Sequence, residues 1–178
     1  PLVKEVVESF GKISGIVHCA GISSRKPLNV LSKDGFSKVM DINFYSFVEL
    51  VKQATKKRYF EDGGSVVVMS SISSIKGYKA KTEYCVSKAA VDAFVRCMAA
   101  ELADRRIRVN SVMAAEVLTP LALKARETNA FVGASDFNAP LGPSEPYEVA
   151  NTIVFLLSDA TKTMTGTSLL IDGGACLS

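Results

Sequence analysis

The sequence predicts an α/β fold in which helices cover both faces of a parallel β-sheet. Short runs rich in β-branched residues alternate along the chain with longer segments whose apolar residues recur at helical spacing. The run Ser65–Met69 is apolar at nearly every position, as expected for a strand buried on both faces. The 178 residues, 48% of them hydrophobic, suffice for one domain with a substantial core. The prediction is therefore a single doubly wound domain.

Four strands and four helices follow from these patterns. The strands are expected over residues 13–19, 65–69, 107–113 and 168–172, and the helices over residues 2–10, 32–58, 82–104 and 145–158. Ser32 is a suitable N-cap, and Pro146 stands in the first turn of the last helix, where its missing N–H group is tolerated. A turn is expected at residues 62–64, a weaker helical stretch up to about residue 130, and irregular structure over residues 131–144.

The composition argues against several kinds of function. The net charge is +3 and the basic residues are scattered, so no basic stripe marks a nucleic-acid interface. The four cysteines form no Cys-x-x-Cys pair, which indicates free thiols in a reducing compartment. A single histidine without a cluster of ligands argues against a metal site. No apolar run reaches the roughly 18 residues of a membrane span and no signal peptide is visible, so we expect a cytoplasmic protein.

Tyr84 and Lys88 have the spacing that points most directly to chemistry. Residues four apart on a helix share a face. An ammonium group beside a phenol favours the phenolate, so it should lower the tyrosine pKa from about 10 and ease proton exchange with a carbonyl or alcohol oxygen. Ser71, at the end of the strand 65–69, is placed to hold the same oxygen. A tyrosine with a lysine at this spacing also occurs by chance, so the surrounding residues have to decide.

Other candidate residues stand near strand ends or inside helices, and each has a structural alternative. Gly21 follows the first strand, where a ligand can approach the backbone closely, but it also suits an ordinary turn. Asn43 lies among apolar neighbours in a helix, where burial would require hydrogen-bond partners. Thr119 follows the third strand and is by itself only a loop residue. His18 is interpreted as a satisfied structural residue, and Cys85 as a packing residue.

Taken together, these motifs resemble the short-chain dehydrogenase/reductase family, of which 3-oxoacyl-acyl-carrier-protein reductases are examples. The matching features are Ser71 at 13 residues before Tyr84, the YxxSK motif Tyr84–Lys88, Asn43 within MDINFYS, HCAG at 18–21, IRVNSV at 107–112 and TGTSLLIDGG at 165–174. They extend over essentially the whole chain. The resemblance implies a Rossmann-like sheet and NAD(P)-dependent interconversion of a carbonyl and a secondary alcohol.

The resemblance also implies a role for each matching residue. Tyr84 would transfer the proton, and Lys88 would lower its pKa and bind the ribose of the cofactor. Ser71 would orient the substrate oxygen, and Asn43 would hold a water molecule linked to Lys88. NADP is slightly favoured over NAD as the cofactor. The implied cofactor-binding residues are Cys19, Ala20, Gly21, Tyr84, Lys88, Val117 and Thr119.

The chain departs from the family pattern in three places. The Gly-rich turn TGxxxGxG, which binds pyrophosphate, is absent, and we expect about the first quarter of the domain, with its first strands, to be missing before Pro1. His18-Cys19 stands where the family usually has two asparagines. Ala114-Ala115, followed by Glu116, stands where the family usually has Pro-Gly, and alanine tolerates positive φ less well than glycine.

Two functions remain open at this point. The first is an oxidoreductase, with a 3-oxoacyl thioester as the leading substrate class, and the second is a non-catalytic relative that serves as a binding or assembly partner. The resemblance implies a homodimer or homotetramer that uses the outer faces of helices 32–58 and 82–104. It also matches residues 119–144 to a variable substrate lid. The expected apolar rim of the substrate pocket is Leu118, Leu121, Leu123, Phe131 and Phe137.

Overall fold

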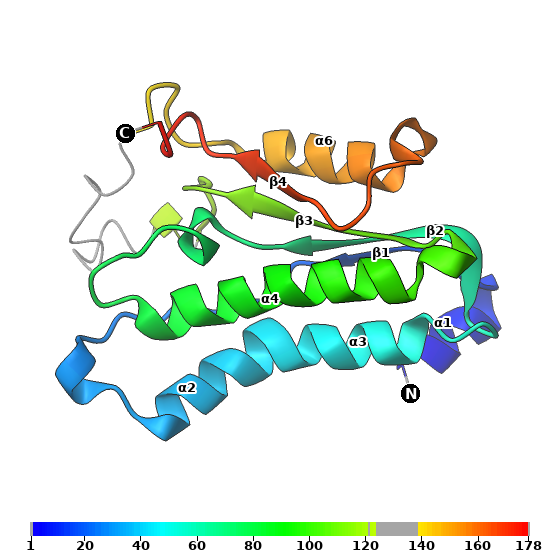
Figure 1. The fold of residues 1–178 in the computed structure, drawn as a ribbon, viewed down its shortest axis with the longest axis horizontal. Coiled ribbons are helices and arrows are strands. Elements are labelled where there is room, and N and C mark those ends of the chain that lie inside the picture. The colour runs from blue at the N-terminus through cyan, green and yellow to red at the C-terminus, as the bar shows by residue number, and fades with distance from the viewer. Residues whose placement is uncertain (1, 121, 124–138, 178) are drawn as a thin grey trace.

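The computed structural model describes residues 2–120, 122–123 and 139–177. It contains a parallel four-stranded sheet in which the strands follow one another in chain order (Figure 1). The strands are β1 (Ile13–His18), β2 (Phe60–Met69), β3 (Arg108–Ala114) and β4 (Ser168–Ile171). All four carboxyl ends therefore meet at one edge of the sheet, where ligands bind in folds of this kind.

Helices cover both faces of this sheet, as predicted. The α-helices are α1 (Leu2–Phe10), α2 (Lys33–Met40), α3 (Ser46–Ala54), α4 (Thr82–Glu101) and α6 (Pro146–Leu157). Short 3-10 turns occupy η1 (Leu28–Val30), η3 (Ile72–Ser74), η4 (Ala103–Arg105) and η6 (Asp159–Thr161). Figure 1 shows α3 and α4 below the sheet in that view and α6 above it.

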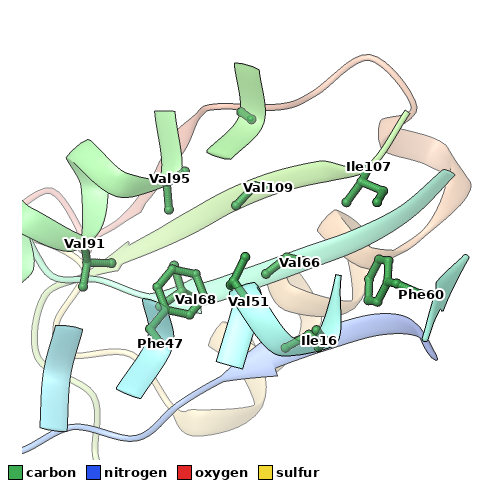
Figure 2. Packing of buried hydrophobic residues seen from close by; sticks show 12 residues of the cluster. Ile16, Phe47, Val51, Phe60, Val66, Val68, Val91, Val95, Ile107 and Val109 are labelled. Atoms are coloured by element: carbon green, nitrogen blue, oxygen red, sulfur yellow. The ribbon is translucent and has the colours of Figure 1, made fainter. Parts of the chain in front are cut away.

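The alternation of side chains along the strands separates two cores. Toward α3 and α4, Val66 and Val68 of β2 pack with Phe47 and Val95 in the larger core (Figure 2). Toward α6, Val67 of β2 lies in a smaller cluster of buried residues, together with Val112, Val149 and Leu156. Burying a side chain of this size contributes about 1.5–3 kcal/mol, so both layers stabilise the sheet.

The crossover that contains α6 has the opposite hand to the crossover that contains α4. Both connect neighbouring strands, and the strand order continues in the same direction from β2 to β3 and from β3 to β4. However, α4 packs on one face of the sheet and α6 on the other. The β1–β2 crossover through α3 lies on the same face as α4 and has the same hand. About 98% of such parallel crossovers are right-handed, so the connection through α6 is the unusual one.

The start of β2 differs from the sequence prediction. Ile13 pairs with Phe60 and Gly15 pairs with Ser65, so the residues between Phe60 and Ser65 bulge out of the ladder. The turn predicted at residues 62–64 is not a separate turn, because these residues belong to β2, where Gly63 has φ 84° within the bulge. The strand begins at Phe60 rather than at Ser65 because the Phe60 side chain is fully buried in the larger core.

The predicted helix 32–58 is shorter and is interrupted. The Ser32 hydroxyl accepts a hydrogen bond from the Gly35 amide at 3.1 Å, which confirms the N-cap. Between α2 and α3 the backbone widens into a π-helical turn, η2 (Asp41–Tyr45). Such turns occur frequently at functional sites. The other predicted strands and helices agree with the structure to within a few residues at their ends, whereas most of the weaker helical stretch up to about residue 130 and of the irregular segment 131–144 lies outside the described residues.

The described residues also bear on the other expectations. None of their helices combines the length and apolar character needed to cross a bilayer. No group of three or more potential metal ligands gathers within ranges 2–120, 122–123 and 139–177. All four cysteines are free thiols: Cys19, Cys85, Cys97 and Cys176.

Candidate active site

The carboxyl edge of the sheet brings the predicted serine, tyrosine and lysine together. Ser71 follows the end of β2, and its hydroxyl caps the short η3 turn by accepting the Ser73 amide at 3.1 Å. The chain then returns to begin α4 at Thr82, which carries Tyr84 and Lys88 one helical turn apart. The Ser71 side chain lies close enough to the Tyr84 phenol to favour its ionised form. The Lys88 Nζ lies 5.7 Å from the centre of the Tyr84 ring.

The Tyr84 pKa is raised above its ordinary value of 10, and this corrects the prediction that Lys88 would lower it. Desolvation by burial is the largest cause of the rise, and the interaction with the Ser71 side chain opposes it only in part. Lys88 is turned instead toward the end of β2, where its Nζ donates to the Met69 carbonyl at 2.8 Å. At neutral pH the Tyr84 phenol is therefore protonated.

The Lys88 pKa falls from 10.5 to about 8, chiefly because the ammonium group is buried. Only 4% of the Lys88 surface is exposed. Negative charge on Asp92 and on the Cys19 thiol acts in the opposite direction and favours the ammonium form. Lys88 is thus still mostly charged at pH 7 but loses its proton before Tyr84 does.

Asn43 lies in the π turn, and its side chain forms hydrogen bonds with the backbone of the segment that follows β1. Its Oδ1 accepts the Ile22 amide at 2.7 Å, while its Nδ2 donates to the Ile22 carbonyl and to the Ser87 hydroxyl, both at 2.9 Å. Both amide protons are used by these two bonds, so a buried asparagine in a helix has the partners that its burial requires. The bonds tie Asn43 to α4, one residue before Lys88.

The segment Cys19–Gly21 passes in front of Lys88. A Cβ placed on Gly21 would lie 3.4 Å from the Asn43 Oδ1 and 3.6 Å from the Lys88 Nζ. The glycine therefore leaves space beside an ammonium group with three donors, of which the Met69 carbonyl takes one. This arrangement fits vicinal hydroxyls such as those of a nicotinamide ribose. Cys19 and Ala20 are exposed as residues. The Cys19 thiol itself is partly shielded from water, which raises its pKa, although Lys88 opposes this rise.

Val117 and Thr119 lie farther along the same edge, after β3. Val117 forms a parallel bridge with Ser144, and the Thr119 hydroxyl accepts the Ala122 amide at 3.2 Å. Thr119 thus caps a turn of helix that starts at Pro120. Leu118 joins this bridge through its amide, which donates to the Ser144 carbonyl at 2.9 Å. Most of the predicted lid, including Leu121, Phe131 and Phe137, lies outside the described residues, whereas Leu123 is 45% exposed.

The structure shows how the chain accommodates Ala114-Ala115 and His18, which depart from the family pattern. Among the described residues, positive φ outside glycine occurs at Ala80 and Arg106, so Ala114 and Ala115 keep ordinary backbone geometry. The buried His18 ring donates from Nε2 to the Ser46 hydroxyl at 2.9 Å, because the Ser46 proton goes to the Ile42 carbonyl. Burial and the nearby Lys88 lower the His18 pKa, so the ring is neutral. His18 is thus the satisfied structural residue that was predicted.

Two buried carboxylates near the site were not singled out from the sequence. Glu83, next to Tyr84, is 1% exposed and pairs with the Lys26 ammonium at 3.6 Å, but neither of its carboxylate oxygens accepts a hydrogen bond. Asp92 is 5% exposed and accepts two hydroxyl hydrogen bonds. The sequence could have indicated Asp92, because it continues the four-residue spacing of Tyr84 and Lys88 along one helix face.

A parallel sheet with polar side chains gathered at its carboxyl edge defines the class of dinucleotide-binding α/β proteins. Comparison with known proteins narrows this class. Residues 1–176 match a family model described as Enoyl-(Acyl carrier protein) reductase. The chain is 33% identical to a 3-oxoacyl-[acyl-carrier-protein] reductase of Thermotoga maritima, over 97% of this chain and 70% of that protein. It is also 33% identical to Enoyl-[acyl-carrier-protein] reductase [NADH] 1 of Rhizobium meliloti, over 94% of this chain and 62% of that protein.

Solved structures agree with these relatives. Aldohexose dehydrogenase of Thermoplasma acidophilum superposes with a TM-score of 0.90 at 27% identity, covering 99% of this chain and 73% of that one. A short-chain type dehydrogenase/reductase of Mycobacterium ulcerans gives 0.89 at 32% identity, covering 99% and 65%. The chain therefore belongs to the short-chain dehydrogenase/reductase family, whose members are NAD(P)-dependent oxidoreductases. These relatives carry the names of enzymes, which favours the enzymatic interpretation over a non-catalytic one.

Proposed function

We propose that this protein interconverts a carbonyl and a secondary alcohol by NAD(P)-dependent hydride transfer, with Asn43, Ser71, Tyr84 and Lys88 as its active-site residues. The observation that carries this proposal is the position of the Ser71 side chain beside the Tyr84 phenol, with Lys88 one helical turn away. Two hydroxyls that meet at the carboxyl edge of a parallel sheet can both bind one substrate oxygen.

Tyr84 is the proton donor when the carbonyl is reduced. When bound, the reduced nicotinamide supplies a hydride to the carbonyl carbon. Negative charge then develops on the substrate oxygen, and Tyr84 gives its phenolic proton to that oxygen while Ser71 donates a hydrogen bond to it. The raised pKa of Tyr84 suits this direction, because the phenol is fully protonated at neutral pH.

Lys88 binds the cofactor ribose next to Tyr84 in this proposal, rather than lowering the Tyr84 pKa. Its ammonium is held by the Met69 carbonyl and flanked by Gly21, which leaves its other donors for the ribose hydroxyls. Asn43 positions the Ile22 backbone and, through Ser87, the turn of α4 that carries Lys88. The water-holding role implied for Asn43 by the family would have to come from its backbone, since both of its amide protons are already used.

The cofactor-binding residues proposed are Cys19, Ala20, Gly21, Tyr84, Lys88, Val117 and Thr119. Exposed backbone at Cys19–Gly21 beside Lys88 supports the first part of this set. NADP is the first cofactor to test, because the Thermotoga relative is a 3-oxoacyl-acyl-carrier-protein reductase, a class for which we expect NADPH. NAD is the alternative, since the Rhizobium relative is named an NADH enzyme.

We infer a 3-oxoacyl thioester as the substrate, with residues 119–144 as the lid over it. The name of the Thermotoga relative supports this choice, and a sugar is the competing substrate because another relative is an L-rhamnose 1-dehydrogenase. Four free thiols support a cytoplasmic location. The exposed faces of α3 and α4 are the proposed contact of a homodimer or homotetramer.

The function is tested by following nicotinamide absorbance in the full-length protein. NADPH and NADH are each supplied with a 3-oxoacyl thioester and with a 2-enoyl thioester, and the oxidised nucleotides are supplied with aldoses. We expect turnover of the 3-oxoacyl thioester, and a loss of roughly 100-fold or more in kcat for Ser71→Ala. Nucleotide binding without turnover of any carbonyl or alcohol would contradict the proposal.

A further inference from the structure

A buried carboxylate on α4 has no part in the mechanism above. Asp92 lies one helical turn beyond Lys88 and two turns beyond Tyr84, so these three side chains follow one face of the helix. Its surface is 5% exposed. An ionised carboxylate at such a place is costly unless hydrogen bonds and a nearby positive charge compensate for the lost water.

Asp92 and Lys88 hold the same end of β2. The Asp92 Oδ2 accepts the Ser70 hydroxyl at 2.9 Å, and the Lys88 Nζ donates to the carbonyl of Met69, the residue before Ser70, at 2.8 Å. The next residue in the chain is Ser71. The oppositely charged side chains of Asp92 and Lys88 are therefore hydrogen-bonded to Ser70 and Met69, the two residues that precede Ser71.

The other oxygen of Asp92 connects the site to the rest of the sheet. Its Oδ1 accepts the Ser111 hydroxyl of β3 at 2.7 Å, and the Ser111 and Ser168 hydroxyls are 2.8 Å apart. Only hydroxyl groups donate to Asp92 in these bonds, so they leave its negative charge in place. The positive charge that balances it is Lys88, whose ammonium form Asp92 favours.

At neutral pH the other groups near Lys88 do not supply that negative charge, although the Cys19 thiol adds to it once it ionises. His18 on β1 is neutral, and the Cys19 thiol, whose pKa is raised, stays protonated at neutral pH. Tyr84 on the same helix is protonated as well. The neighbouring η3 turn contains only Ile72 and serines. The titratable residues of α2 and the π turn are all exposed: Lys33, Asp34, Lys38, Asp41 and Tyr45. Arg108 of β3 donates to carbonyls at the end of α6.

We propose that Asp92 is a positioning residue that keeps Lys88 protonated and holds it, together with Ser70 and Ser71, at the end of β2. This role rests on the proposed function of Lys88. It predicts that removal of the Asp92 charge changes the pH at which Lys88 loses its proton. A merely structural hydrogen-bonding role predicts a loss of stability or rate at every pH, without such a change.

Titration of Lys88 tests this directly, without any need for turnover. In the full-length protein labelled with 13C at the lysine ε-carbon, the Lys88 signal is assigned by its absence in Lys88→Arg and is followed by NMR from pH 6 to 11. We expect a midpoint near 8 in the unmodified protein. In Asp92→Asn the midpoint should fall by about one pH unit, since an oppositely charged neighbour shifts a pKa by about 1–3.

Two further variants separate charge from hydrogen bonding. Asp92→Ser removes the charge with a smaller side chain, in case Asp92→Asn does not fold. Ser111→Ala removes a hydrogen bond to Asp92 but leaves the charge, so its midpoint should stay near 8. An unchanged midpoint in a folded Asp92 variant, or an equal fall in Ser111→Ala, would overturn the proposal.

The pH dependence of kcat/KM connects this titration to the reaction. In Asp92→Asn the alkaline limb should move to lower pH by the same amount as the Lys88 midpoint, because the ammonium form is then lost earlier. If the unmodified protein showed no turnover, the proposed function would fail, but the NMR midpoints would still decide the role of Asp92. If the Lys88 midpoint moved in Asp92→Asn while the alkaline limb of kcat/KM stayed in place, the link between Asp92 and the reaction would be overturned.

Discussion

Burial moves the pKa values of Tyr84 and Lys88 in opposite directions. The phenol is raised above 10, and the amine falls from 10.5 to about 8. On raising the pH, Lys88 therefore loses its proton first, while Tyr84 can still act as an acid. An alkaline limb of activity near pH 8 would then report the loss of the Lys88 ammonium rather than the ionisation of the Tyr84 phenol.

The lowered pKa of Lys88 predicts that stability rises with pH between about 8 and 10.5. In this range the unfolded chain keeps the Lys88 proton while the folded chain has released it, so the unfolded state binds more protons and the free energy of unfolding increases. At 1.36 kcal/mol per unit, the increase is at most about 3 kcal/mol. Guanidinium unfolding at pH 7.5 and pH 9.5 measures it.

Lys88→Met should remove this increase, because its side chain has no proton to lose. Lys4→Met serves as the control, since Lys4 is exposed on α1 and should keep the increase. Above pH 10 the raised pKa of Tyr84 acts in the opposite sense, so the comparison is restricted to lower pH. An increase of equal size in the unmodified protein and in Lys88→Met would contradict the assignment.

At the scale of elements, the end of α6 depends on one buried arginine. Arg108, at the start of β3, donates to the carbonyls of Leu156, Leu157 and Ser158 and to the Thr161 hydroxyl. These carbonyls have no partner inside the helix, and a cation there also complements the helix dipole. The arginine thus joins the unusual α6 crossover to the sheet.

Arg108→Met should lower the free energy of unfolding by about 3 kcal/mol, because the helix carbonyls lose a buried, charged partner. Arg106→Met is the matched control, as Arg106 is exposed and should change stability by no more than about 0.5 kcal/mol. Urea titration followed by circular dichroism measures both. Equal midpoints for the two variants would show that the Arg108 bonds contribute little.

The elements also show how far the sequence could predict the structure. The order of strands and helices and the Ser32 cap follow from local patterns, so they were predicted. The π turn was not, because apolar residues keep nearly the same 3–4 spacing whether or not one residue is inserted into a helix. The start of β2 was missed because its first residue, Phe60, is separated from the apolar run by the bulge at Asp62–Gly64.

The candidate site was predictable to a similar extent. Helical spacing correctly placed Tyr84 and Lys88 on one face, and the motif distance placed Ser71 against Tyr84. The direction of the Tyr84 pKa shift could not be predicted, because burial depends on the packing of distant segments around the phenol. Asp92 was missed because a carboxylate on a helix is ordinarily exposed, and only the fold shows that this one faces Ser70 and Ser111.

At the scale of the whole molecule, the two ends of the sheet differ. The proposed reactive groups lie at the carboxyl edge, whereas a cavity of about 670 Å³ at the amino edge is lined by other residues, including Asp62, Arg106 and Lys162. On the outer face of α4, small or apolar residues are exposed at helical spacing: Val86, Ala89, Ala93, Cys97 and Ala100. A face of this kind suits close packing against a second helix.

Ala93→Arg should therefore dissociate the proposed oligomer, because a long charged side chain would enter the centre of the helix contact. Ala160→Arg is the matched control, as Ala160 is exposed in η6, at the end of α6. Sedimentation of the full-length protein measures both. Loss of the dimer or tetramer in Ala93→Arg alone is expected, and an unchanged assembly would exclude this face as the contact.

The role of Tyr84 as proton donor is tested most directly by single-turnover hydride transfer in Tyr84→Phe. The full-length variant is saturated with reduced nucleotide and mixed with its carbonyl substrate at pH 7, with Tyr45→Phe as the control because Tyr45 is 55% exposed. The account predicts a rate about 10²–10⁴-fold lower for Tyr84→Phe and an unchanged rate for Tyr45→Phe. A near-normal rate in Tyr84→Phe would show that the proton comes from another group.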